Sequence, residues 1–434
     1  MTDSELGRVV LSLCVLLSAA HFLGYISVRL RQPRVIGEIV AGILLGPSLF
    51  ARLAPTVSQF IFSTGSAKPD QYGTIAGFIY SLGLLLLMFT SGAETRNLFC
   101  RQNRWQTAWL AGFGTGLPFL ITLACVGFLP LSHLMGPGHQ RSALILVIGI
   151  AIAVTSIPVI SRIFFDLKIL HTRFASIVLG VAVIEDIVLW ALLAVALALA
   201  SSSLLPRHII AEHIAITLLY FAAGLSLGPA VLRQFSASRW NIVAKISPVG
   251  YVIAVLFAYT ALAAALNVSL VFASFLAGFG FASEGSQFNE ALDSISKFSF
   301  AVFIPIYFAI VGYKIDLRSS FSISMLLVFL VCGCALKIVG VAAGAKLAGF
   351  SRLDTINLAF ATNARGGPGI VLASVALDAG IINPLFYTTL VLTALITSQA
   401  AGAWLGFVLR KGWPLLSVAS TVEVPTFGAA VRTD

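Results

Sequence analysis

The chain has 434 residues, of which 59% are hydrophobic and only 10% are charged, and its formal net charge is +10. A soluble domain carries about 25% charged residues, so this composition excludes an ordinary soluble fold and predicts a polytopic membrane protein. The basic residues lie in short loops between apolar runs, which favours membrane topology over nucleic-acid binding as the origin of the positive charge.

Apolar runs recur along the whole chain, and a membrane-spanning helix needs about 20 such residues. We therefore expect one all-α membrane domain over 1–411 with about 13 transmembrane helices, followed by a polar, disordered cytoplasmic tail over 412–434. The expected spans lie at approximately 6–29, 35–51, 74–93, 105–130, 142–165, 174–200, 208–232, 246–265, 267–283, 293–314, 322–348, 353–379 and 384–409.

The loop charges predict the orientation of these spans. With the N-terminus outside, eighteen Lys and Arg residues fall in inside loops and seven fall in outside loops. Lys and Arg are enriched in cytoplasmic loops, so this bias predicts an odd number of spans, with the N-terminus outside and the C-terminus in the cytoplasm.

Short motifs recur at a spacing of seven spans. Ala41-Gly42 in the second span recurs as Ala277-Gly278 in the ninth, and Gly92 in the third recurs as Gly312 in the tenth. Because seven is an odd number, the matched helices run in opposite directions through the membrane. The spacing therefore predicts an inverted-topology repeat, which is typical of secondary transporters.

The run 174–200 is apolar apart from two adjacent acids, Glu185 and Asp186. A carboxylate at bilayer depth costs about 2.5–3.5 kcal/mol on insertion scales, so two of them predict a functional site. Consecutive helical residues point about 100° apart, and one acid can therefore be paired while the other stays available. The alternative, a soluble core helix with a satisfied acid pair, is disfavoured by the apolar spans on both sides.

Two of the expected spans contain helix-breaking residues, again seven spans apart. Pro158 and Pro368 each remove a backbone donor, and Gly366, with two further glycines, loosens the second helix. The freed backbone groups cannot face lipid, so the breaks must be buried or line a wet cavity. Half-helix ends carry partial charges, so the two breaks predict an ion site near the midplane. Ordinary proline kinks are the alternative at each position.

Lys337 and Arg365 are the two cations that fall inside expected spans. Lys337 lies deep in 322–348 and needs an anionic partner, and Glu185 and Asp186 are the acids expected at comparable depth. Two acids and one lysine leave a single surplus negative charge, which suits a proton or a monovalent cation. The partner of Arg365 stays open, and stabilising the crossed helix ends is one role for it.

Four motifs carry a family pattern: Arg34–Pro47, Ala153–Arg162, Phe308–Leu317 and Asn363–Gly366. Together they resemble the monovalent cation:proton antiporter superfamily. The similarity is to its second branch, which includes bacterial Na+/H+ and K+/H+ antiporters and plant cation/H+ exchangers. The resemblance covers nearly the whole chain apart from the tail.

The resemblance implies a sodium/proton antiporter-like fold with two crossed discontinuous helices. It also implies a core domain that moves like an elevator against a dimerisation scaffold. The implied core helices lie around 74–200 and 293–409, and the implied scaffold helices lie around 6–51 and 208–283. A homodimer in the inner (plasma) membrane of a bacterium is the corresponding expectation.

The resemblance implies residue roles as well. Asp186 matches the aspartate that binds the ion, and it is the metal ligand we expect for a monovalent cation. Glu185 occupies the preceding position, Lys337 matches the lysine that pairs with that acid, and Thr155 and Ser156 match polar residues near the ion. The residues expected at the helix breaks are Pro158, Asn363, Arg365, Gly366 and Pro368.

Two positions depart from the relatives. Glu185–Asp186 stands where they usually have Asp-Asp or Asn-Asp, and Gly369 stands where many carry a glutamate after the Arg-Gly stretch. The choice between Na+ and K+ and the transport stoichiometry therefore stay open.

Desolvation disfavours a charged carboxylate, so H+ and the cation should compete for Asp186, and only a neutralised site should cross the membrane. This predicts a secondary transporter that exchanges Na+ or K+ for H+ by alternating access. A cation channel or a proton-coupled organic-solute transporter is the nearest alternative. We expect no enzyme, because the nearest approach to a zinc-protease motif, His208–His213, has the wrong spacing. We also expect no cofactor, nucleotide or nucleic acid; the partners would be the ions, the lipid bilayer and a second copy of the chain.

Overall fold

The computed structural model describes residues 3–30, 32–62, 71–97, 103–125, 131–201, 207–238, 241–281 and 285–417. Within these ranges the chain is helical apart from its connections and one isolated antiparallel bridge between Met135 and Ile382. Eleven of the described helical segments are long and apolar enough to cross a membrane, and Leu270–Phe281 and Gly366–Asp378 are shorter apolar helices. The all-α, multi-pass membrane fold is thereby confirmed, whereas the count of about 13 spans stays a prediction.

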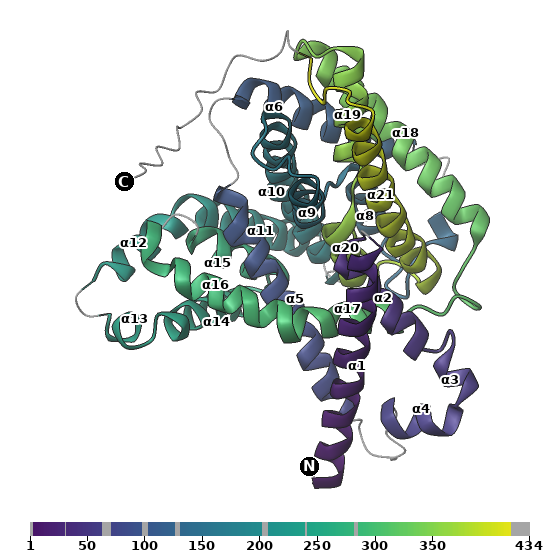
Figure 1. Ribbon diagram of the computed structural model, residues 1–434. Coiled ribbons are helices and arrows are strands. Elements are labelled where there is room, and N and C mark those ends of the chain that lie inside the picture. The colour runs from purple at the N-terminus through teal and green to yellow at the C-terminus, as the bar shows by residue number, and fades with distance from the viewer. Residues whose placement is uncertain are drawn as a thin grey trace, which may run out of the picture.

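The helices form two packed groups, which Figure 1 shows in different parts of the molecule. The first group comprises α1 (Asp3–Arg29), α2 (Arg34–Leu45), α5 (Gln71–Asn97), α12 (Gly228–Ser236), α13 (Ile242–Ile246), α14 (Pro248–Ala265), α15 (Leu270–Phe281), α16 (Asn289–Phe298) and α17 (Ile304–Tyr313). The second group comprises α6 (Arg104–Ala111), α7 (Leu117–Cys125), α8 (Arg141–Ala153), α9 (Ile157–Asp166), α10 (Arg173–Ser201), α18 (Ile323–Leu347), α19 (Arg352–Thr362), α20 (Gly366–Asp378) and α21 (Pro384–Arg410).

The remaining described elements include α11 (Arg207–Ser226), which lies between the two groups, and several short elements. Helix α11 packs against α10 of the second group and against α15 of the first. The short helices α3 (Phe50–Leu53) and α4 (Pro55–Phe62) follow α2 and pack against each other. A π-helical turn, Gly112–Gly116, joins α6 to α7.

Glycines allow two pairs of helices in the first group to approach each other closely where they cross. A Cβ added at Gly42 of α2 would collide with the backbone of α17, and one at Gly312 of α17 would collide with the backbone of α2. The same relationship holds between Gly92 of α5 and Gly278 of α15. The glycines that recur in the sequence therefore form two equivalent close crossings, as an inverted repeat requires.

Both predicted helix breaks are present. Helix α8 ends at Ala153 and α9 begins at Ile157, while α19 ends at Thr362 and α20 begins at Gly366. Pro158 and Pro368 each lie in the first turn of the second half-helix. Backbone N–H groups in a first turn make no hydrogen bond within the helix, so a proline there removes none. The two prolines therefore start new helices and do not kink continuous ones.

Residues 412–417 are attached to α19, which corrects the tail boundary expected at 412. The buried carboxylate of Asp354 accepts hydrogen bonds from the backbone N–H of Ser417 at 2.7 Å and from its hydroxyl at 2.8 Å. The Asn357 amide donates to the carbonyl of Leu415 at 3.1 Å. Buried polar groups at the start of α19 use this segment as their partner, so it is fixed. Residues 418–434 lie outside the described residues.

Candidate functional site

The two interrupted helices are held together at their extended segments. The backbone N–H of Ser156 donates to the carbonyl of Ala364 at 2.6 Å, and the Thr155 hydroxyl donates to the carbonyl of Thr362 at 2.5 Å. The N–H of Gly367 donates to Ser156 Oγ at 3.2 Å. All of these groups are buried, so the freed backbone groups of one break satisfy those of the other.

Gly366 is required by the geometry of the crossing. Its φ is +31°, and a Cβ there would collide with the side chains of Val159 and Ser156. Its N–H donates to the hydroxyl of Ser398 at 3.1 Å, which fixes the start of α20 against α21. A side chain at this position would be strained and would also push α20 away from α9.

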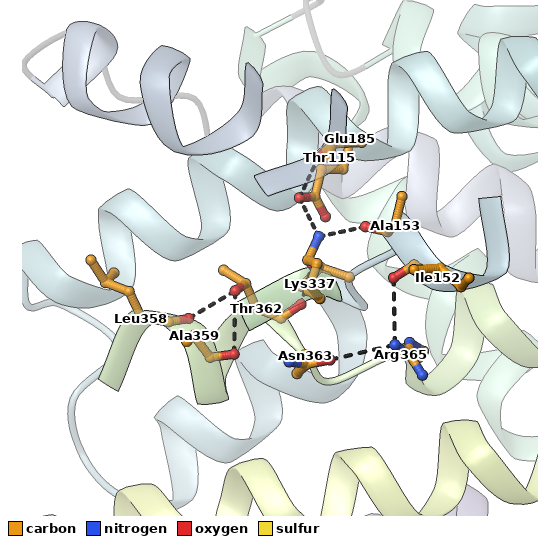
Figure 2. A network of polar contacts seen from close by, with 11 residues as sticks. Thr115, Ile152, Ala153, Glu185, Lys337, Leu358, Ala359, Thr362, Asn363 and Arg365 are labelled. Atoms are coloured by element: carbon orange, nitrogen blue, oxygen red, sulfur yellow. Dashed lines mark hydrogen bonds and ion pairs between the residues drawn. The ribbon is translucent and has the colours of Figure 1, made fainter. Parts of the chain in front are cut away.

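Two buried cations cap the C-terminal end of α8. Figure 2 shows the ammonium of Lys337 donating to the carbonyl of Ala153 and the guanidinium of Arg365 donating to the carbonyl of Ile152, the latter at 3.4 Å. A helix C-terminus carries partial negative charge and favours nearby cations. The same Arg365 nitrogen lies 3.5 Å from Oδ1 of Asn363. The partner that the sequence left open for Arg365 is therefore the broken helix itself.

Lys337 also forms a buried ion pair with Glu185. Its Nζ lies 2.7 Å from Oε1 of Glu185, and neither side chain is exposed. The hydroxyl of Thr115 donates to the same oxygen at 2.6 Å (Figure 2). Thr115 was missed by the sequence reasoning, and its only signal is a hydroxyl within the glycine-rich stretch 112–116.

Asp186 differs from its neighbour Glu185 in that no described residue pairs with its carboxylate. The residue is fully buried, and neither carboxylate oxygen has a hydrogen-bond partner within the part of the chain that the structure describes. Helix α10, which carries it, packs against α8, α9, α19 and α20, so Asp186 belongs to the helix set that contains both breaks. An unpaired carboxylate at this depth is chemically able to bind a proton or a monovalent cation.

The hydroxyl groups of Thr155 and Ser156, both in the first helix break, differ in how many further hydrogen bonds they can accept. Thr155 Oγ1 donates its hydrogen to a carbonyl, which leaves its lone pairs free to accept or to coordinate. Ser156 Oγ accepts from Gly367 and also from the N–H of Val159, at 3.4 Å, where it caps α9. The oxygen of Ser156 is thus occupied by two donors, and its main role in this structure is to hold the crossing.

A cleft of about 390 Å³ lies between α10 and the helices α11, α12 and α15. Val183 and Ile187 of α10 line one wall, and they flank Asp186 along the helix. Ser226, Pro229, Ala230 and Arg233 are among the residues of the facing wall. Neither Glu185 nor Asp186 lines this cleft, which borders α10 on the side of its neighbours Val183 and Ile187.

The chain is similar to known proteins over nearly its whole length. The model of the family described as sodium/hydrogen exchanger, transmembrane, matches residues 16–411. Cation/H+ antiporter 17 of Arabidopsis thaliana is 26% identical over 409 residues, covering 91% of this chain and 48% of the plant protein. The Na+/H+ antiporter NhaS4 of Synechocystis is 25% identical, covering 92% of this chain and 96% of the relative.

A solved structure shares the fold. The sodium proton antiporter MjNhaP1 from Methanocaldococcus jannaschii superposes with a TM-score of 0.65 and 16% identity, covering 94% of this chain and 99% of that one. The chain spans about half the length of the plant relatives that it matches and nearly the whole length of the cyanobacterial one.

Proposed function

The chain belongs to the sodium/hydrogen exchanger family, and we propose that it exchanges a monovalent cation, Na+ or K+, for H+ across a membrane, with both ions competing for Asp186. One observation carries this proposal. Glu185 is paired with Lys337, whereas the equally buried carboxylate of Asp186 has no partner among the described residues. A buried, unpaired carboxylate is costly unless a proton or a cation neutralises it, so one or the other should occupy it.

The ligands of the cation would be oxygens, as hard cations prefer. Asp186 supplies the charge, and Thr155 has hydroxyl lone pairs that the crossing does not use. Backbone carbonyls at the breaks would complete the coordination. Ser156 was expected to be a ligand as well, but its two N–H donors favour a positioning role.

Transport would follow from charge neutralisation. The Glu185–Lys337 pair contributes no net charge. The net charge of the buried site therefore depends on whether Asp186 is ionised, protonated or bound to a cation. A site with Asp186 protonated or cation-bound crosses the low-dielectric interior at lower cost than an empty, ionised site. Only loaded states would therefore exchange sides, which couples the cation flux to the proton flux.

The moving part would be the second helix group, with the first group as the scaffold. The cleft beside α10 lies at the boundary between the two, where a relative movement would open or close access. The family resemblance implies a core at 74–200 and 293–409, but α5 packs against α15 and α17 packs against α2. This packing favours placing α5 and α17 in the scaffold with 6–51 and 208–283.

The remaining assignments rest on the loop charges and on the family. We assign the N-terminus to the outside, the C-terminus to the cytoplasm, the inner membrane of a bacterium as the location and a homodimer as the assembly. The family is one of exchangers, so we assign no catalytic chemistry and no cofactor to the chain. The mass of the purified particle in nanodiscs would test the dimer.

The proposal is tested in proteoliposomes that contain a pH-sensitive dye, with Na+, K+ and Li+ added in turn. The variant Asp186→Asn should abolish cation-driven proton movement, and its fold should survive because no described residue hydrogen-bonds to the carboxylate that is replaced. The matched control is Asp166→Asn at the exposed end of α9, where the carboxylate forms a surface ion pair with Arg162, and it should keep transport. Cation-driven proton movement by Asp186→Asn would refute the proposal, and cation current without proton movement would indicate a channel instead.

A further inference from the structure

A second, smaller cavity is lined by Glu185 and by no residue of the two helix breaks. Its volume is about 190 Å³, and it lies between α10 and the stretch that runs from α6 through the π-helical turn Gly112–Gly116 into α7. Nearly all of its lining is apolar, with Phe119 and Leu192 among the wall residues. The exchange of ions at Asp186 makes no use of this cavity.

The cavity exists because two glycines face it. A Cβ added at Gly112 or at Gly116 would meet no atom within 4 Å, so both positions border open space. Gly114, between them, lies on the opposite face and approaches Val341 of α18 closely. Close packing against α18 thus explains one glycine of the turn but leaves the other two unexplained by packing.

The cavity opens onto the apolar outer surface of the helix bundle. Val188, which lines it, is 46% exposed, and Leu120 of the neighbouring α7 is 62% exposed. In a multi-pass membrane protein such a surface faces acyl chains. A ligand would therefore enter from the bilayer and must itself be largely apolar.

The inner end of the cavity is polar. Oε1 of Glu185 accepts hydrogen bonds from Lys337 and Thr115, but Oε2 is buried and has no partner within the described residues. Glu185 and Thr115 both line the cavity. A carboxylate oxygen left without a donor is destabilised, and a charged N–H group is the strongest donor that a ligand can supply.

We propose that this cavity is a binding site for a small lipophilic amine in its ammonium form, which reaches Glu185 laterally from the bilayer. The ammonium donates to Oε2 of Glu185, and the apolar part packs against Phe119 in the space that Gly112 and Gly116 leave open. An apolar cavity of about 150 Å³ holds a benzene molecule, so a ring with one aminomethyl group fits the size of this one. The site does not depend on the exchange of ions at Asp186.

The test uses the full chain in nanodiscs and radiolabelled benzylamine at neutral pH, where the amine is protonated. Uptake by empty nanodiscs is subtracted, and benzyl alcohol, which has the same shape and no charge, is the comparison compound. Benzylamine should bind saturably, at one molecule per chain, about tenfold or more tightly than the alcohol because its hydrogen bond is charge-assisted. Equal binding of the two compounds, or unsaturable uptake, would overturn the proposal.

Two variants locate the site. Gly116→Val places a side chain into open space, so it should fold normally and lose benzylamine binding. The matched control is Gly7→Val on the exposed start of α1, where a Cβ also meets nothing within 4 Å, and it should bind like the wild type. The double variant Lys337→Met/Glu185→Gln, which removes both charges of the buried pair, should keep weak binding but lose the preference for the amine. Undiminished binding by Gly116→Val would refute the site, and because binding is read without transport, that failure is separate from a failure of ion exchange.

Discussion

Lys337 and Glu185 form an ion pair in which both side chains are completely buried and Nζ lies 2.7 Å from Oε1. The pair links α18 to α10 and, through the carbonyl of Ala153, to the broken end of α8. The pair makes the two adjacent acids different, because Glu185 is neutralised by Lys337 whereas the carboxylate of Asp186 has no partner among the described residues.

Removing one member of this pair should destabilise the fold more than removing both. Lys337→Met leaves Glu185 as an uncompensated buried charge, and breaking a buried pair in this way costs about 3–5 kcal/mol. The double variant Lys337→Met/Glu185→Gln removes both charges and should recover most of that loss. The free energy of unfolding in mixed micelles measures the difference. Equal destabilisation of the single and double variants would contradict the assignment of the pair.

Gly366→Ala should disrupt the crossing of the two broken helices. The new Cβ combines positive φ with a collision against Val159 and Ser156, and overpacking of a tight site costs about 1–3 kcal/mol. Gly412→Ala is the control, since its φ of +69° carries the backbone strain but a Cβ there meets nothing within 4 Å. Thermal midpoints of the purified variants give the comparison. Similar losses for both would mean that backbone strain alone, and not the crossing, accounts for the effect.

Asp378 at the end of α20 joins the two helix groups. Its carboxylate accepts from Lys314, which follows α17, at 2.6 Å and from the hydroxyl of Tyr80 in α5 at 2.9 Å. Lys314 and Asp378 are 27% and 41% exposed, so their coupling should be about 0.2–1 kcal/mol. A double-mutant cycle with Lys314→Met and Asp378→Asn measures it, and high salt should reduce it. A coupling that does not change with salt would contradict a solvent-exposed ion pair.

Asp316, in the loop after α17, should make stability depend on acid pH. The hydroxyl of Ser319 donates to it at 2.7 Å, and with the N–H of Arg318 and the nearby Arg52 it lowers the pKa of this carboxyl below 3.8. Because the pKa is lower in the folded state, the stabilisation is present above the unfolded-state pKa of about 4 and is lost as the pH falls further. The difference in thermal midpoint between the wild type and Asp316→Asn should therefore be constant near neutral pH and shrink in acid. A difference that grows on acidification would have the wrong sign.

The sequence alone was sufficient for the class of fold and for the residues with unusual positions. A bilayer requires about 20 apolar residues per span, so the spans, and any charge inside them, stand out in a linear pattern. Glu185, Asp186, Lys337 and Arg365 were recognised in this way. The two breaks were recognised as well, because proline and glycine act on the local backbone and need no distant partner.

Only the tertiary structure determines which of these residues form ion pairs and hydrogen bonds with one another. Lys337 and Glu185 are 152 positions apart, and which of two adjacent acids the lysine reaches depends on how α10 is rotated against α18. The same applies to the hydrogen bond from Thr115 to Glu185 and to the one from Arg365 to the end of α8, because the local sequence does not show either contact. The small cavity at Gly112 and Gly116 also becomes visible only when the helices are packed. Local patterns encode burial and helix ends, whereas the rotation and register of packed helices follow from many contacts at once.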